Sequence, residues 1–209
     1  MKKVAFICGM AVLAGCAGKQ EYIRPTGTAT IEVTKTVNRP RSEVWDRAVP
    51  QLGKQFFVIN NLDKSSGLIN LSYSGDPEKY IDCGRVISFV QNARGERTYN
   101  FPGSKAQSEY EMMLDGTLIA VSRRMDLDGR VNVIFEEVDP QTTKVTANAR
   151  YVVKRDVTIR DMRGNSRSTS ASTSFNGNGN GTLPQARALE PAECRANGEL
   201  EREILQNIN

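Results

Sequence analysis

The sequence has no histidine among its 209 residues. Imidazole is the usual base beside serine and cysteine nucleophiles and a common ligand of zinc and haem iron. Its absence excludes Ser-His-Asp triads, Cys-His pairs and histidine-ligated metal or haem sites. Any catalysis would therefore have to use lysine or carboxylate groups.

Strong net charge is also missing. The formal charge is +4, and Lys2 and Lys3 at the N-terminus account for part of it. Nucleic-acid-binding domains need a basic patch beside a recognition element, and no Lys/Arg cluster adjoins a predicted helix. We therefore expect no nucleic-acid partner.

A hydrophobic run long enough to span a membrane as a helix, about 20 residues, is absent. The N-terminus has instead a charged start, an apolar segment over residues 4–12, and Leu13-Ala14-Gly15-Cys16. This layout is typical of a secretory signal peptide, here residues 1–15. The sequence Leu-Ala-Gly-Cys resembles the lipobox of bacterial lipoproteins.

The lipobox resemblance implies cleavage before Cys16, a lipid thioether on its sulfur and a fatty acyl group, such as palmitate, on its new amino group. The protein would then be a membrane-anchored lipoprotein facing the periplasm. Ala17 follows the cysteine, where an aspartate would signal retention in the inner membrane of enterobacteria, so the resemblance implies the outer membrane. A signal peptide without lipidation, or a short apolar N-terminus with a chance cysteine, is the alternative.

Four cysteines are present, of which Cys8 would leave with the signal peptide and Cys16 would be lipidated. Cys83 and Cys194 remain. In an oxidising compartment two remaining thiols most simply pair, so we predict a Cys83–Cys194 disulfide. Two separately buried thiols, or a bond to a partner chain, are the alternatives.

Hydrophobic periodicity predicts the remaining organisation. Residues 16–27 are short and polar and predict a lipidated N-terminus with a flexible tether, followed by one periplasmic domain over 28–209. Residues 91–107 predict a surface loop, Asp128-Gly129 a hairpin turn, and the Asn-Gly repeat at 176–181 a flexible loop. The predicted strands are 28–37, 56–62, 68–73, 116–127, 130–138, 144–161 and 166–175, and the predicted helices are 42–56 and the segment after Gly198.

This element order predicts an α+β fold, an antiparallel sheet with helices packed on one face. The opening segment resembles the helix-grip domains of BamC, the lipoprotein of the outer-membrane β-barrel assembly machine. The resemblance rests on Pro40, Val44-Trp45, Leu52, Phe57-Val58-Ile59, Asp63, Gly67-Leu68-Ile69 and Leu71. It covers about 50 residues and implies a helix-grip-like fold with a structural role in envelope assembly.

Trp45, Val49 and Leu52 share the apolar face of the predicted helix. Such a face packs into a core more often than it lines a binding site. A pocket between helix and sheet, lined by these three residues and holding a lipid or small apolar ligand, is the alternative.

The remaining polar patterns give no catalytic set. Glu136 and Glu137 point to opposite faces of a strand, and Asp126 and Asp128 flank a predicted turn without the further oxygen ligands that calcium needs. Serines alternate from Ser166 to Ser174, which indicates a solvated strand face. We therefore expect no enzyme activity, no metal and no cofactor.

Two functions remain. The first is a non-enzymatic lipoprotein that binds a protein partner as an accessory of an envelope complex, and it predicts a filled core with an exposed apolar patch or strand edge. The second is the helix-grip pocket, which predicts a cavity at Trp45, Val49 and Leu52.

Overall fold

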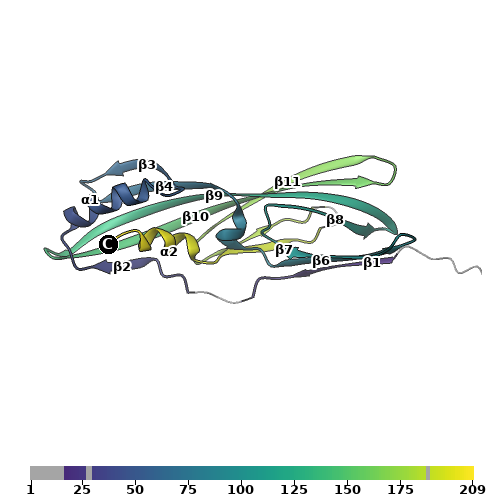
Figure 1. Ribbon diagram of the computed structural model, residues 1–209, viewed down its shortest axis with the longest axis horizontal. Helices are drawn as coiled ribbons and strands as arrows, with labels where there is room; N and C mark the ends of the chain where they lie inside the picture. The colour runs from purple at the N-terminus through teal and green to yellow at the C-terminus, as the bar shows by residue number, and fades with distance from the viewer. Residues whose placement is uncertain (1–16, 27–29, 187–188) are drawn as a thin grey trace, which may run out of the picture.

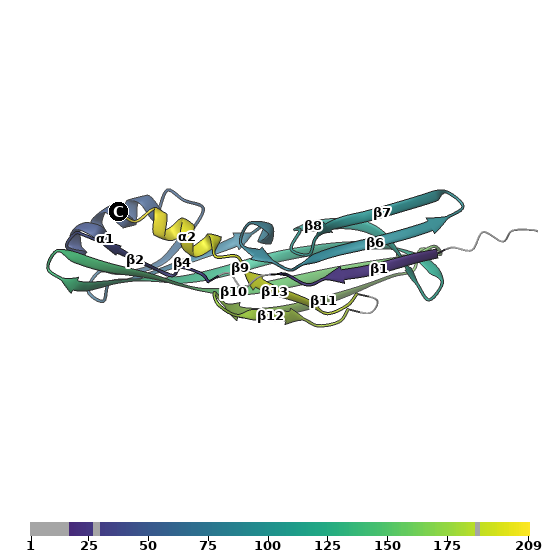
Figure 2. The same ribbon diagram turned by 90° about the horizontal axis from the view of Figure 1, so that it is seen from below.

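A computed structural model describes residues 17–26, 30–186 and 189–209 (Figure 1). The predicted signal peptide and Cys16 lie outside the described residues. The molecule is elongated, and both views show its two longest strands running along its length (Figures 1 and 2).

These two strands, β9 (Thr117–Asp139) and β10 (Thr142–Asp161), form one antiparallel hairpin. At about 3.4 Å per residue, their 23 and 20 residues make a spine roughly 70 Å long. Odd-numbered residues are buried from Ile119 to Phe135 on β9 and from Thr143 to Val157 on β10. One face of the spine is therefore covered along most of its length, and the even-numbered residues form an open outer face.

The predicted hairpin turn at Asp128-Gly129 is wrong, because β9 continues through both residues. Gly129 lies under α2 (Glu199–Gln206), where an added Cβ would stand 3.2 Å from the Leu200 side chain. A glycine inside a strand often marks such a close approach, and here the missing side chain admits the helix.

The main sheet has the order β11-β10-β9-β4-β3, with β2 paired to β10 near one end of the spine and β8 paired to β9 near the other. Every pairing in it is antiparallel. The bounds of these strands are β2 Thr34–Val37, β3 Val58–Asp63, β4 Leu68–Gly75, β8 Gln107–Leu114 and β11 Ser166–Asn176.

Two helices, α1 (Arg41–Leu52) and α2, cover the buried face at one end of the spine (Figure 2). The helix α1 buries one stripe, Val44, Trp45, Ala48 and Leu52, and the Trp45 ring meets the Phe135 ring edge-on at 5.2 Å. Leu200, Ile204 and Leu205 attach α2 to the same core. An eight-residue helix is marginal alone, so this packing stabilises it.

At the other end a three-stranded sheet, β1-β6-β7, contributes to a second hydrophobic cluster. A further small sheet, β12-β13-β5, and the 3-10 helix η1 lie between the two ends. The bounds are β1 Ala17–Ile23, η1 Pro77–Lys79, β5 Ile81–Asp82, β6 Arg85–Asn92, β7 Gly95–Pro102, β12 Asn180–Leu183 and β13 Ala192–Ala196.

The predicted α+β class is therefore wrong. The fold is β-rich, with 62% strand and 12% helix among the described residues. The strand–helix–strand–strand order predicted for the opening segment is present as β2, α1, β3 and β4, but it makes up only one end of the molecule. The predicted tether and the predicted surface loop at 91–107 are wrong where they form β1 and β7. Both segments are polar because only alternate side chains of these strands are buried or half-buried.

Candidate functional site

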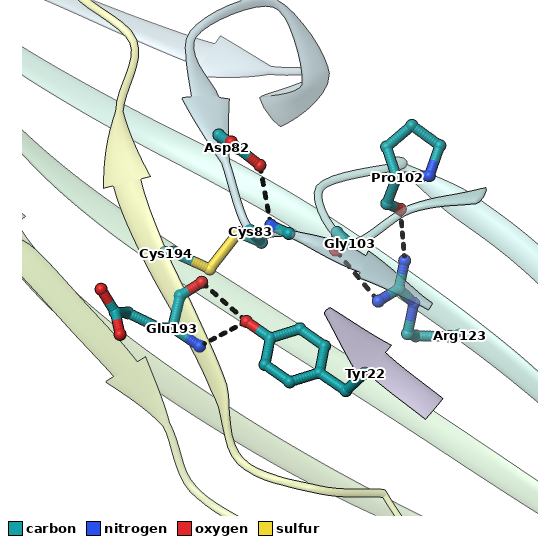
Figure 3. The surroundings of a disulfide bond; sticks show 9 residues. Tyr22, Asp82, Cys83, Pro102, Gly103, Arg123, Glu193 and Cys194 are labelled. Carbon is teal, nitrogen blue, oxygen red and sulfur yellow. Dashed lines mark hydrogen bonds between the residues drawn. A yellow bond between two sulfur atoms is a disulfide. The ribbon is translucent and has the colours of Figure 1, made fainter. Parts of the chain in front are cut away.

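A disulfide joins Cys83 to Cys194, as predicted, across 111 residues of sequence (Figure 3). Both cysteines are fully buried. The bond connects the residue after β5 to the middle of β13, and β13 leads directly into α2. It therefore holds the C-terminal segment against the centre of the molecule.

Tyr22 ties β1 to the same region. Its hydroxyl donates to the Glu193 carbonyl oxygen at 3.1 Å and accepts from the Glu193 amide at 2.9 Å (Figure 3). Burial raises the pKa of Tyr22, so the phenol stays protonated and able to donate. These bonds, together with the pairing of β1 to β6 from Ala17 onward, correct the predicted tether over residues 17–23.

Arg123 is a buried cation in this part of the protein, with 3% of its surface exposed. It donates to the carbonyl oxygens of Pro102 and Gly103, as Figure 3 shows, and to the Ser108 hydroxyl. Burial lowers its pKa to about 10, which still leaves it charged at neutral pH. The guanidinium is used to fix the turn between β7 and β8, so we assign it a structural role.

The helix residues predicted to line a core or a pocket are packed. Trp45 and Leu52 belong to the main hydrophobic core, and Val49 is partly buried against it. This is the arrangement that a filled core requires.

Two of the carboxylates considered in the sequence pair with neighbouring cations. Asp126 pairs with Arg124 at 3.1 Å, and Glu136 pairs with Lys144 at 3.1 Å. Over residues 17–26, 30–186 and 189–209, no cluster of Cys, Asp and Glu could hold a metal ion. The helices in that same part of the chain include none that is long and apolar enough to cross a membrane.

The strand β11 is the first candidate interaction surface. It ends the sheet order, and no strand among the described residues pairs with its outer edge. The Asp161 amide donates to the Asn165 carbonyl, and the Gly177 amide donates to the Ala149 carbonyl. In an antiparallel ladder, residues that are hydrogen-bonded to the partner strand alternate with residues that are not. Asn165 and Gly177, just before and just after β11, are both bonded to β10 or its end, so the odd-numbered residues of β11 bond to β10.

The even-numbered residues of β11 consequently point their main-chain amide and carbonyl groups away from the sheet. They are Ser166, Ser168, Ser170, Ser172, Ser174 and Asn176, all exposed. The tip of the β10–β11 hairpin extends clear of the neighbouring strands in Figure 1, and Met162 at this tip is 67% exposed. The serine alternation predicted from sequence is thus a solvated face with an open main-chain edge beside it.

The outer face of the main sheet is the second candidate surface. One cross-strand row consists of asparagines from four strands, Asn61, Asn70, Asn132 and Asn148. The next row contains Ser72, Arg130 and Arg150, where the two arginines are direct cross-strand partners. This surface was not predicted from the sequence, although the spacings Arg130-x-Asn132 and Asn148-x-Arg150 on facing strands carried the signal.

A buried polar pair lies between α2 and the spine. Glu201 is fully buried, and one of its carboxylate oxygens accepts a 2.7 Å hydrogen bond from Tyr151. Its other oxygen has no hydrogen-bond partner among the residues that the structure describes. Burial raises the pKa of Glu201. The predicted flexible loop at 176–181 packs here, since an added Cβ on Gly177 would stand 2.6 Å from the unpartnered oxygen.

Comparison with known proteins finds no matching family model, no matching curated protein and no matching solved structure.

Proposed function

We propose that the chain is a non-enzymatic, lipid-anchored periplasmic protein that binds a protein partner by strand addition to β11. The observation that carries the proposal is the unpaired outer edge of β11, with the main-chain groups of five alternate serines directed outward. An open strand edge pairs readily with an extended segment of another chain.

The strand is suited to reversible pairing. It is 11 residues long, most of its exposed side chains are small and hydroxylated, and Arg167 is its only charged residue. Large or charged side chains and prolines are the usual protection of an edge, and β11 has little of that protection. Few apolar side chains accompany the edge, so specificity would come from the register of the main-chain bonds.

The anchor part of the proposal rests on the lipobox at Leu13-Ala14-Gly15-Cys16. The strand β1 starts at Ala17, at the end of the molecule opposite α1 (Figure 1). A lipid on Cys16 would therefore hold the protein by this end, close to the exposed β10–β11 tip, without a spacer. The partner would then be an envelope protein near the membrane surface, in our proposal the outer membrane.

The alternative function, a lipid pocket between helix and sheet, gains no support from the packing of Trp45 and Leu52. The face of α1 that would line it is occupied by core contacts, among them the ring contact between Trp45 and Phe135.

Site-specific photocrosslinking in intact cells tests the proposal. A photoreactive residue at Ser170 should give one discrete adduct of defined mass, and one at Met162 should give the same adduct. Val138, 61% exposed at the opposite tip of the spine, is the matched control and should give none. Adducts that are equally strong from Val138, or absent from both test positions, would contradict the proposal.

The anchor is tested separately. Labelled palmitate should enter the protein and be lost in Cys16→Ala. Retention of the label in Cys16→Ala would refute lipidation at this residue, and leave the β11 proposal standing.

A further inference from the structure

Outer-face side chains near the middle of the spine break two rules of strand composition. Asparagine is depleted in strands, yet four strands place one in the same row. Like charges directly opposite each other are destabilising, yet Arg130 lies opposite Arg150 in the adjacent row. Local rules are broken chiefly where a function requires it.

The two arginines also lack the partners that nearby cations have. Arg124, Lys144 and Lys154 lie on the same face, and each has a carboxylate at 3.1 Å or less. Within the described residues, Arg130 and Arg150 make no ion pair. Among the described residues, the one hydrogen bond made by either arginine side chain is a weak bond of 3.4 Å from Arg150 to the Ser174 hydroxyl.

The surface is hollowed where these rows meet. One hollow of about 1000 Å³ lies over β3, β4 and β9, and another of about 870 Å³ lies beside the edge of β10. Arg130, Asn132 and Arg150 line both of them. Each hollow is large enough for a sugar-sized ligand, and the arginine pair stands between the two.

The chemistry of these groups indicates the ligand. Two adjacent guanidinium groups favour a phosphate or carboxylate, which they can bind through paired charge-assisted hydrogen bonds. Side-chain amides both donate and accept, so a row of asparagines suits neighbouring hydroxyl groups. Asn70 already donates to Asn132 at 2.7 Å, which orients both amides. Asp128 also lines the larger hollow and offers a further acceptor for hydroxyls.

We infer that this outer face binds an anionic sugar, with its phosphate or carboxylate on Arg130 and Arg150 and its hydroxyl groups along the asparagine row. The inferred site uses side chains on β4, β9 and β10, whereas the proposed strand addition uses main-chain groups at the outer edge of β11. The inference is therefore independent of the proposed strand addition and of the lipid anchor.

Binding to the protein without its signal peptide can be measured by calorimetry and by amide chemical-shift changes. Glucose 6-phosphate and trigalacturonate serve as phosphorylated and carboxylated probes, and maltotriose and inorganic phosphate serve as controls for sugar and anion alone. At least one anionic sugar should bind about tenfold or more tightly than maltotriose and than inorganic phosphate. Which of the two binds identifies the anionic group.

The variant Arg130→Gln/Arg150→Gln should weaken that binding about tenfold or more, with an unchanged melting temperature or a slightly higher one. Arg124→Gln/Lys154→Gln removes the same charge from the same face and should change binding less than about twofold. Asn132→Ala should weaken the binding of the anionic sugar and leave any binding of inorganic phosphate unchanged.

Four results would each overturn the inference. They are no binding of either anionic sugar, equal binding of maltotriose, equal binding of inorganic phosphate, and equal losses in the two double variants.

Discussion

The Tyr151 hydroxyl donates a 2.7 Å hydrogen bond to the Glu201 carboxylate inside the hydrophobic core. This bond fixes α2 to the spine, and burial raises the pKa of both groups. A buried carboxyl with a raised pKa favours its neutral form, which costs less to bury than a carboxylate.

The stability of the protein should therefore depend on pH through Glu201. Its folded-state pKa lies above the ordinary glutamate value of 4.5, so the folded state binds the proton more tightly than the unfolded state does. The stabilisation that this difference in proton binding gives to the folded state is complete below about pH 4.5. It is lost as the pH rises from there through the folded-state pKa. Relative to Glu201→Gln, which cannot ionise, the wild type should lose stability over that range.

Urea denaturation at several pH values measures this difference. Glu137→Gln, at an exposed position of β9, is the control. Its free energy of unfolding should change with pH in the same way as that of the wild type. If the free energies of unfolding of the wild type and Glu201→Gln differ by the same amount at all pH values, the pKa of Glu201 is not raised.

Gly177→Ala should destabilise the protein by about 1–3 kcal/mol, because the new methyl group would overlap the Glu201 carboxylate oxygen. Gly53→Ala is a matched control with no backbone strain and only ordinary contacts at 3.4 Å and beyond. Its free energy of unfolding should be unchanged or slightly higher. Equal effects of the two substitutions would show that the loop at 176–181 does not pack against Glu201.

Removal of the disulfide should lower the free energy of unfolding by up to about 4–5 kcal/mol, since the bond closes a long loop in the unfolded chain. Cys83→Ala/Cys194→Ala, compared with the oxidised protein in urea, measures the loss. In protein that begins at Ala17, a thiol count after unfolding without reductant should be zero. Free thiols there would contradict the bond.

Leu52→Ala should cost about 2–5 kcal/mol, because Leu52 is fully buried and the surrounding core cannot close the space. Val49→Ala, on the same helix and only partly buried, should cost clearly less. Thermal and urea unfolding of both variants checks this. A small loss of stability in Leu52→Ala would indicate an unfilled space beside Leu52 and would support the pocket hypothesis.

The sequence predicts the structure correctly where a residue's pattern or chemistry favours one outcome over its alternatives. Cys83 and Cys194 were the two thiols left for pairing, and the stripe containing Trp45 and Leu52 fits the buried face of a helix. The long alternation after Lys144 gave most of β10, because side-chain direction alternates strictly along a strand.

Prediction from the sequence fails where tertiary contacts decide the local structure. Asp128-Gly129 has the composition of a hairpin turn, and only the approach of Leu200 from the far end of the chain explains the glycine. Ala17–Ile23 is polar, and its strand depends on pairing with β6 and on the bonds of Tyr22 to Glu193. The Arg130–Arg150 pair needs the register of β9 on β10, which the sequence alone does not supply.

Strand addition to β11 is tested most directly by a single proline. Ser170→Pro removes one outward main-chain amide and leaves the bonds of β11 to β10 in place, as prolines on edge strands do. Ser170→Ala keeps that amide and removes only the hydroxyl. Thr169→Pro removes an amide that bonds to β10 and serves as the destabilising reference.

The measurement is the yield of the Met162 crosslinked adduct in cells, alongside the melting temperature of each variant. We predict that Ser170→Pro melts close to the wild type and far above Thr169→Pro, and loses the adduct, while Ser170→Ala retains it. A full adduct yield in folded Ser170→Pro would contradict binding through the edge of β11.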